Sequence, residues 1–204
     1  MSDTEPAPRT APRQLWLIAQ TFLGVLHMLF GAPEDVAARH TLTRAAHTLM
    51  ASWLRVGEAL MRRLLLIEAA ALPPSAPRTP RTRAHTRTRQ AMSFAADAPE
   101  TWRACFACMD RRRPAGMRRS RLAGRRRSMR LASAWPLAER YEALIRVFNQ
   151  PAPYAHRLAR TLHAAPQRRG CVLRAPPEAE HRIEDYWALD RAAEDAARRF
   201  MDSS

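Results

Sequence analysis

Two cysteines three positions apart are the first candidates for chemistry in this 204-residue chain. Cys105 and Cys108 form a Cys-x-x-Cys motif, a spacing found both in zinc sites and in redox-active thiol pairs. A structural zinc site needs two further ligands, but Cys171 is the only other cysteine and no second pair exists. A thioredoxin-like centre needs a βαβ context, which the sequence does not provide. We therefore expect no metal or redox chemistry, and three cysteines are typical of a reducing compartment.

The histidines form two pairs at a spacing of seven residues. His40 with His47, and His156 with His163, would each lie about 10 Å apart along a helix. Helical metal pairs use a spacing of four residues, so neither pair is expected to share an ion. No serine or cysteine lies in a nucleophile motif, and a chain with six glycines and no lysine has no phosphate-binding loop. The sequence predicts a protein that is not an enzyme, with no catalytic residues, metal or cofactor.

Clustered arginines are the feature with the clearest functional implication. The net charge is +15, and residues 73–130 hold 16 arginines against 3 acids, whereas residues 1–72 and 131–204 each have a net charge of +1. A segment of such charge attracts polyanions, and contacts to phosphates are independent of base sequence. The arginines predicted to bind nucleic acid are Arg111, Arg112, Arg113, Arg118, Arg119, Arg121, Arg125, Arg126 and Arg127.

Two observations temper this interpretation of the arginines. The chain contains no lysine, and arginine makes bidentate phosphate contacts better than lysine does. The nearly neutral residues 1–72 and 131–204 also lack lysine, however, so we attribute the use of arginine in place of lysine to coding bias. The competing interpretation of the charge run is a solvated linker without a ligand. Phe94, Trp102 and Phe106 could stack on single-stranded bases, but we expect them to pack on the protein's own helices instead.

The elements that position these candidate residues are predicted to be arranged around a long helical pattern over residues 33–72. Its apolar residues recur at steps of three and four and form one stripe, opposite a polar side, as in an amphipathic surface helix. Forty helical residues would span about 60 Å, so we expect a break near residues 41–43. Gly57 costs about 1 kcal/mol relative to alanine, and either a close neighbouring helix or neutral drift would explain it. The polar side consists of Arg44, Thr48, Arg55, Glu58 and Arg62.

An apolar run over residues 15–30 precedes this pattern. A membrane-spanning helix needs about 20 apolar residues, and this shorter run contains Gln20 and His27, which favours a mostly buried core helix. A signal peptide or membrane anchor is the alternative, because arginines come before the run. The short turn at Gly31 predicts that this helix packs antiparallel on residues 33–72 as a helical hairpin.

Helical spacing also predicts three helices in the C-terminal part. The first begins at Pro136, the second carries Tyr154, and the last spans about residues 178–201, after a loop that contains Gly170. Within the basic part, Asp97 is a candidate cap for a short helix near residues 98–110 that would dock through Trp102, Phe106 and Met109.

The fold predicted from these patterns is all-α: a small helical bundle built on an N-terminal hairpin and three C-terminal helices. Residues 1–13 are expected to be a disordered tail and residues 14–72 the hairpin. Residues 73–130 are expected to be basic and mostly disordered, and residues 131–204 to pack on the hairpin.

The function predicted from the charge is that of a cytoplasmic, non-enzymatic adaptor. Its arginine-rich segment would bind nucleic acid or an acidic protein without sequence specificity. The alternative is a membrane-associated protein, anchored by residues 15–30 with the arginines on anionic lipid. Exposed apolar area on so few helices also favours a homodimer.

Overall fold

The computed structural model describes residues 10–73, 96–109, 131–175 and 186–202. Helices dominate the described residues, so the predicted all-α class is confirmed. In chain order the elements are α1 (Arg13–Phe30), α2 (Pro33–Ala38), β1 (Thr41–Thr43), α3 (Arg44–Ala70), the 3-10 turn η1 (Pro99–Thr101), β2 (Leu131–Ser133), α4 (Trp135–Asn149), α5 (Ala152–Ala164), the 3-10 turn η3 (Pro166–Arg168), α6 (Arg169–Leu173) and α7 (Tyr186–Asp202).

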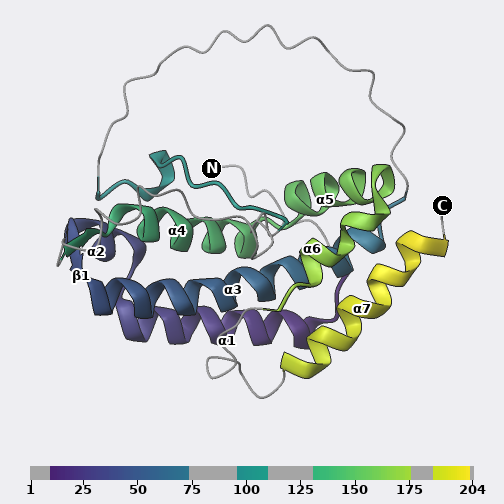
Figure 1. Ribbon diagram of the computed structural model, residues 1–204, viewed down its shortest axis with the longest axis horizontal. Helices are drawn as coiled ribbons and strands as arrows, with labels where there is room; N and C mark the ends of the chain where they lie inside the picture. The colour runs from purple at the N-terminus through teal and green to yellow at the C-terminus, as the bar shows by residue number, and fades with distance from the viewer. Residues whose placement is uncertain (1–9, 74–95, 110–130, 176–185, 203–204) are drawn as a thin grey trace, which may run out of the picture.

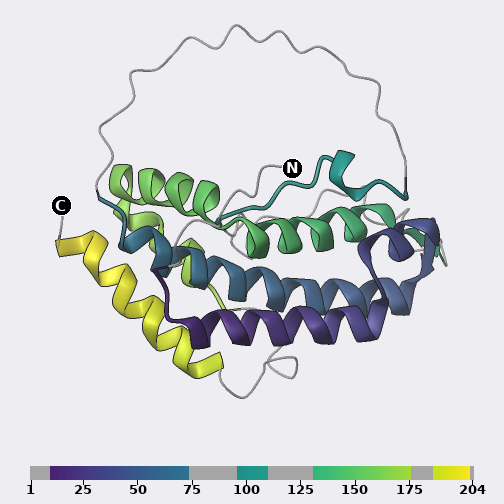
Figure 2. The same cartoon turned by 180° about the vertical axis from the view of Figure 1, so that it is seen from behind.

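Helix α3 is the centre of the bundle. Helices α4 and α5 lie on one side of it, α1 lies on the other, and α7 crosses its C-terminal half (Figures 1 and 2). Most of residues 50–69 are buried, including Arg62 from the predicted polar side, Arg63 and Glu68. The prediction of an amphipathic surface helix is therefore wrong for this part of α3, because five helices pack around it and leave little of it to solvent.

The expected break in the pattern over residues 33–72 is confirmed, and it takes the form of a small β-ribbon. Strand β1 separates α2 from α3 and pairs antiparallel with β2. The chain turns before β1 at His40, whose φ is +53°, and the His40 carbonyl accepts a hydrogen bond from the Ala134 N–H at 2.9 Å. Thr43 then caps α3, since its hydroxyl accepts the Ala46 N–H at 3.3 Å.

Helix α1 lies antiparallel along α3, as the hairpin prediction requires, but it is a peripheral helix (Figure 1). Six of its 18 residues are buried, whereas Leu17 and Leu29 are about half exposed and Met28 is 79% exposed. The prediction of a mostly buried core helix is therefore wrong, because α1 is covered mainly by α3. Residues 13–38 are also long and apolar enough to cross a membrane, which by itself is weak evidence, so the membrane anchor stays a prediction.

The C-terminal helices agree with the prediction except before the last one. Helices α4 and α5 begin and end close to the expected positions. The expected loop around Gly170 is wrong: η3 and the short α6 occupy it, because Val172 is fully buried against the bundle. Residues 178–185, the predicted start of the last helix, lie outside the described residues. Leu189, Ala193, Ala196 and Phe200, which recur at steps of three and four along α7, are buried.

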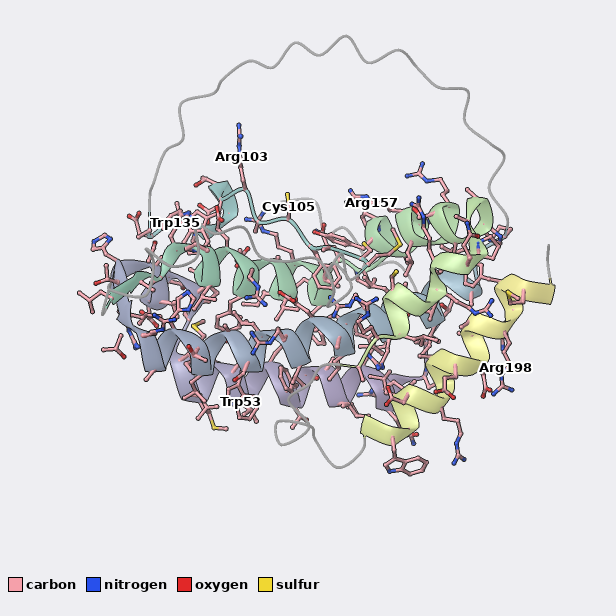
Figure 3. The ribbon with its side chains drawn as sticks, viewed as in Figure 1. Trp53, Arg103, Cys105, Trp135, Arg157 and Arg198 are labelled. Carbon is pink, nitrogen blue, oxygen red and sulfur yellow. The ribbon has the colours of Figure 1, made fainter. Side chains whose placement is uncertain are left out.

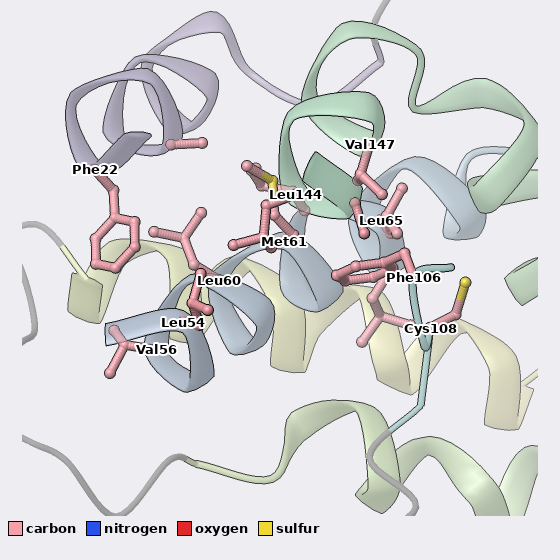
Figure 4. Packing of buried hydrophobic residues seen from close by; sticks show 14 of the residues in the cluster. Phe22, Leu54, Val56, Leu60, Met61, Leu65, Phe106, Cys108, Leu144 and Val147 are labelled. Atoms are coloured by element: carbon pink, nitrogen blue, oxygen red, sulfur yellow. The ribbon is translucent and has the colours of Figure 1, made fainter. Parts of the chain in front are cut away.

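Gly57 of α3 lies close to side chains of both α1 and α4. A Cβ atom at this position would be 2.8 Å from Cε1 of Phe22 and 3.1 Å from Cδ1 of Leu144. Figure 4 shows Phe22 and Leu144 among the buried side chains that pack around α3. The close helix neighbour therefore explains this glycine without neutral drift.

Alanine at Gly57 is expected to destabilise the protein although alanine favours helix. The extra methyl group would press on the Phe22 ring, and overpacking a core costs about 1–3 kcal/mol, against a gain of about 1 kcal/mol in helix propensity. Gly24→Ala on α1 is the matched control, because nothing lies within 4 Å of its Cβ position. Chemical denaturation should show a lower free energy of unfolding for Gly57→Ala and a higher one for Gly24→Ala; stabilisation by both would contradict the packing.

Tyr141 on α4 is expected to make the fold sensitive to alkali. Burial raises the pKa of this phenol from 10 to about 12, and the nearby Glu34 carboxylate adds to the effect. The unfolded chain therefore loses the proton first, so stability present below pH 10 is lost as the pH rises toward 12. Between pH 9 and 11 the wild-type free energy of unfolding should fall by roughly 1 kcal/mol more than that of Tyr141→Phe, measured by urea denaturation. Parallel pH profiles would contradict the shifted pKa.

Candidate functional site

The strap, residues 96–109, joins two arginine-rich segments, residues 74–95 and 110–130, which lie outside the described residues. It begins with η1 and then runs extended over α4 toward the start of α5 (Figure 1). The predicted helix near residues 98–110 is therefore wrong, since only one 3-10 turn forms. Burial along the strap alternates with a period of two, as it does in an extended chain. The buried side chains are Trp102, Phe106 and Cys108, and the exposed ones between them are Arg103, Cys105 and Ala107.

Aromatic contacts and one arginine hold the strap on the bundle. The Trp102 ring lies 5.0 Å from the Trp135 ring, and Phe106 contacts Tyr154 edge to face at 6.2 Å. Arg146 on α4 donates hydrogen bonds to the carbonyls of Trp102, at 3.2 Å, and of Pro99. The prediction that Trp102 and Phe106 pack on the protein's own helices is therefore confirmed; Phe94 lies outside the described residues.

The Cys-x-x-Cys motif is divided between the two sides of the strap. Cys105 points away from the helices and is exposed, whereas Cys108 is buried beside Phe106 (Figures 3 and 4). Burial raises the pKa of the Cys108 thiol, an effect that Arg157 and Arg62 partly oppose. A raised pKa keeps this sulfur protonated and weakly nucleophilic. Among the described residues no three of His, Cys, Asp or Glu are grouped to hold a metal ion.

The histidine pairs are not brought together as sites. His40 lies in the turn before β1, whereas His47 lies on α3. His156 and His163 both lie on α5, and the His163 ring packs edge to face on Phe200 at 4.9 Å.

All nine arginines predicted to bind nucleic acid fall in residues 110–130, outside the described residues. The structure does describe the four points where the two arginine-rich segments join the bundle. Pro73 follows the end of α3, Ala96 and Met109 are the two ends of the strap, and Leu131 begins β2. Each arginine-rich segment is therefore joined to the bundle at both of its ends.

Several arginines of the bundle have acidic or carbonyl partners close by. Arg63 pairs with Asp190 of α7 and donates to the Leu173 carbonyl at 2.9 Å. Arg140 pairs with Glu58 at 2.7 Å, and Arg146 pairs with its helix neighbour Glu142 at 2.7 Å. The two arginine-rich segments, in contrast, contain 15 arginines and a single acid. Their charge can be neutralised only by groups from elsewhere.

A cavity of about 350 Å³ opens where α2, the β-ribbon and the start of α4 meet. No sequence pattern predicted this cavity, because its walls come from separate parts of the chain that only the fold brings together. Trp135, one of the lining residues, lies beside the strap in Figure 3. The cavity is lined by Ala37, His40, Ala96, Ser133, Trp135 and Pro136.

Comparisons of the chain with protein-family models, with curated proteins and with solved structures find no match. Its function must therefore be argued from its own residues.

Proposed function

We propose that this protein is a non-enzymatic, cytoplasmic helical adaptor that binds nucleic acid through its two arginine-rich segments, without sequence specificity. The observation that carries the proposal is the partition of charge. The 43 residues of the two arginine-rich segments hold 15 arginines against one acid, in a chain whose remaining arginines and acids nearly balance. Such a field attracts a phosphate backbone and releases its counterions.

The attachment of the segments supports the proposal. Both segments join the bundle at both ends, and the docked strap between them carries Arg103 on its exposed side (Figure 3). All these arginines are therefore tethered to one bundle. A strand that binds some of them has the others nearby, so their effective concentration is higher than on separate tails. An acidic protein would satisfy the same charge and is the competing partner.

The membrane-associated alternative has less support. Helix α1, which carries the exposed apolar residues Leu17, Met28 and Leu29, lies across α3 from the strap and α4 (Figures 1 and 2). If α1 inserted into a lipid surface, that surface would contact the side of the bundle opposite to the strap. The same apolar residues are the candidates for a homodimer contact.

A salt series with random nucleic acid tests the proposal. Wild-type protein should bind a random duplex and an oligo(dT) of equal length with a steep dependence on salt. For six to nine phosphate contacts, log Kd should change with log salt by a slope of about 4–6 for the single strand. Fluorescence anisotropy between 50 and 300 mM salt gives the slope, with poly-glutamate as competitor. A slope near zero, or stronger binding of poly-glutamate than of either nucleic acid at equal charge, would contradict the proposal.

A further inference from the structure

We propose that the exposed face of α1 binds a second copy of this chain, with the two α1 helices packed antiparallel. The face lies across α3 from the strap and α4 (Figures 1 and 2). The contact needs no nucleic acid and therefore goes beyond the proposed function. It gives a partner to the apolar side chains that α1 leaves exposed.

The exposed face of α1 carries almost no charge. Residues 14–33 contain no aspartate, glutamate, lysine or arginine, so Arg13 is the only charged residue of the helix. A helix at the edge of a bundle normally carries charged groups on its solvent side. Here that side instead includes Leu17, which is 47% exposed, and Met28, which is 79% exposed. Depletion of charge is typical of the centre of a protein–protein interface.

The spacing of the exposed residues suits a second copy of the same helix. Leu17, Thr21, Gly24 and Met28 are all exposed, at steps of four, three and four. Such steps form the seam of a two-helix coiled coil. The series is the same in both chain directions, so in an antiparallel pair Leu17 lies opposite Met28 of the other copy, and Thr21 lies opposite Gly24. Both copies then use the same surface, as a two-fold symmetric dimer requires.

Gly24 fits this pairing. A glycine within a helix costs about 1 kcal/mol relative to alanine, and at Gly57 the close side chains of Phe22 and Leu144 explain that cost. At Gly24 no described group of another element lies within 4 Å of the Cβ position. In the dimer Thr21 of the other copy would lie against this bare stretch of backbone, where a glycine permits a close approach.

The same pairing brings opposite charges together at both ends of the contact. Arg13 would lie opposite Ala32 of the other copy, and the Ala32 N–H donates a hydrogen bond to the Asp35 carboxylate at 2.9 Å. The exposed Arg13 guanidinium would therefore approach the exposed Asp35 carboxylate, and two-fold symmetry forms this contact twice. An anionic lipid surface would repel Asp35. Charge complementarity and symmetric spacing thus favour a second copy over lipid.

The size of the face sets the expected affinity. Eighteen helical residues extend about 27 Å, so the contact is smaller than the roughly 800 Å² per partner of a standard interface. We therefore expect a reversible dimer with a Kd between about 1 and 100 µM.

Sedimentation equilibrium of the full chain tests the dimer, after nuclease treatment and at about 0.5 M salt, which weakens nucleic-acid contacts. Wild-type protein should pass from monomer to dimer as its concentration rises through the expected Kd. Leu17→Glu and Met28→Arg should each raise that Kd at least about tenfold, because each places two unpaired charges in the contact. Met201→Arg, a similar change at a 49% exposed position of α7, should leave the Kd unchanged. Thermal unfolding of each variant checks that the bundle stays folded.

A mixture of two variants tests the antiparallel pairing. Equal amounts of Leu17→Glu and Met28→Arg should dimerise at least about tenfold more tightly than either variant alone, because the new carboxylate lies opposite the new guanidinium. A parallel pairing would place Leu17 opposite Leu17, so the mixture would gain nothing. Failure of the mixture to dimerise, or unchanged Kd values for both variants, would overturn the pairing.

Flotation with vesicles of phosphatidylcholine, with and without phosphatidylserine, separates the dimer from a lipid contact. Wild-type protein should stay with the soluble fraction in the salt of the sedimentation experiment. A protein that remains monomeric at every concentration and floats with the vesicles would overturn the dimer and assign this face of α1 to lipid. Each of these results is obtained without nucleic acid, so the proposed function stands or fails separately.

Discussion

Glutamine at the nine arginines from Arg111 to Arg127 is expected to weaken binding of random nucleic acid by at least about 1000-fold at 50 mM salt. Each arginine that contacts a phosphate displaces counterions, so removing most of the contacts removes most of the affinity and flattens the salt dependence. The bundle should keep its stability, because its core consists of apolar side chains that these substitutions do not change. Anisotropy titrations and thermal unfolding of the same preparation measure both quantities.

The matched control replaces the same nine arginines by lysine. If positive charge is what binds the phosphates, the Kd of the lysine variant should stay within about tenfold of the wild-type Kd. Lysine keeps the charge and loses only the bidentate geometry. Unchanged binding by the glutamine variant would contradict the role of these residues. Deleting residues 78–130 is a poorer test, because it would remove Trp102 and Phe106 from the core.

Alanine at Glu68 is expected to cost about 2–4 kcal/mol in the free energy of unfolding. The Glu68 carboxylate is buried on α3 and accepts hydrogen bonds from the N–H groups of Thr10, at 2.9 Å, and of Ala11, at 3.1 Å. It also accepts the Trp16 indole N–H at 3.1 Å and the Thr10 hydroxyl. Without the carboxylate, the buried N–H groups of Ala11 and Trp16 lose their partner, and the start of α1 is no longer fixed to α3.

Two further variants separate this hydrogen-bond network from a general packing effect. Glu68→Gln retains one acceptor oxygen and should lose about half as much stability as Glu68→Ala. Trp16→Phe removes one donor, so a double-mutant cycle with Glu68→Ala should show a coupling of about 0.5–2 kcal/mol. Urea denaturation measures the change in the free energy of unfolding for Glu68→Ala, Glu68→Gln, Trp16→Phe and the double variant. Additive losses, or a cost below about 0.5 kcal/mol for Glu68→Ala, would mean that the network is unimportant.

Periodicity and turn residues were enough to predict the class of fold. Prolines placed the starts of α2 and α4 correctly, and the excessive length of the pattern over residues 33–72 predicted the break at β1. These signals are local, because a proline or a run of apolar spacing acts on the backbone near it. The pairing of β1 with β2 involves residues about 90 positions apart, which no local pattern announces.

The roles of α1 and α3 were exchanged in the sequence-based prediction. Residues 15–30 are the more apolar run and yet lie at the periphery, whereas α3 buries Arg63 and Glu68. Hydropathy describes a residue's preference for burial, but the number of helices that surround an element decides how much of it is buried. Arg63 and Glu68 can be buried because α7 and the start of α1 supply partners, and these partners are distant in sequence.

The candidate site was predictable in its charge and in the docking of two aromatic side chains, but not in its shape. The arginine clusters are visible in the sequence, and so was the docking of Trp102 and Phe106. The extended form of the strap was missed because a cap and a proline near Asp97 resemble a helix start. The cavity was invisible, since its lining residues meet only when α2, the strap and the β-ribbon come together.

Photo-crosslinking of wild-type protein to a bromouridine-containing strand, mapped by mass spectrometry, tests the central claim most directly. The crosslinked peptides should come from the two arginine-rich segments, residues 74–95 and 110–130. Crosslinks confined to α1, α7 or other surfaces of the bundle would contradict the claim that these segments bind nucleic acid.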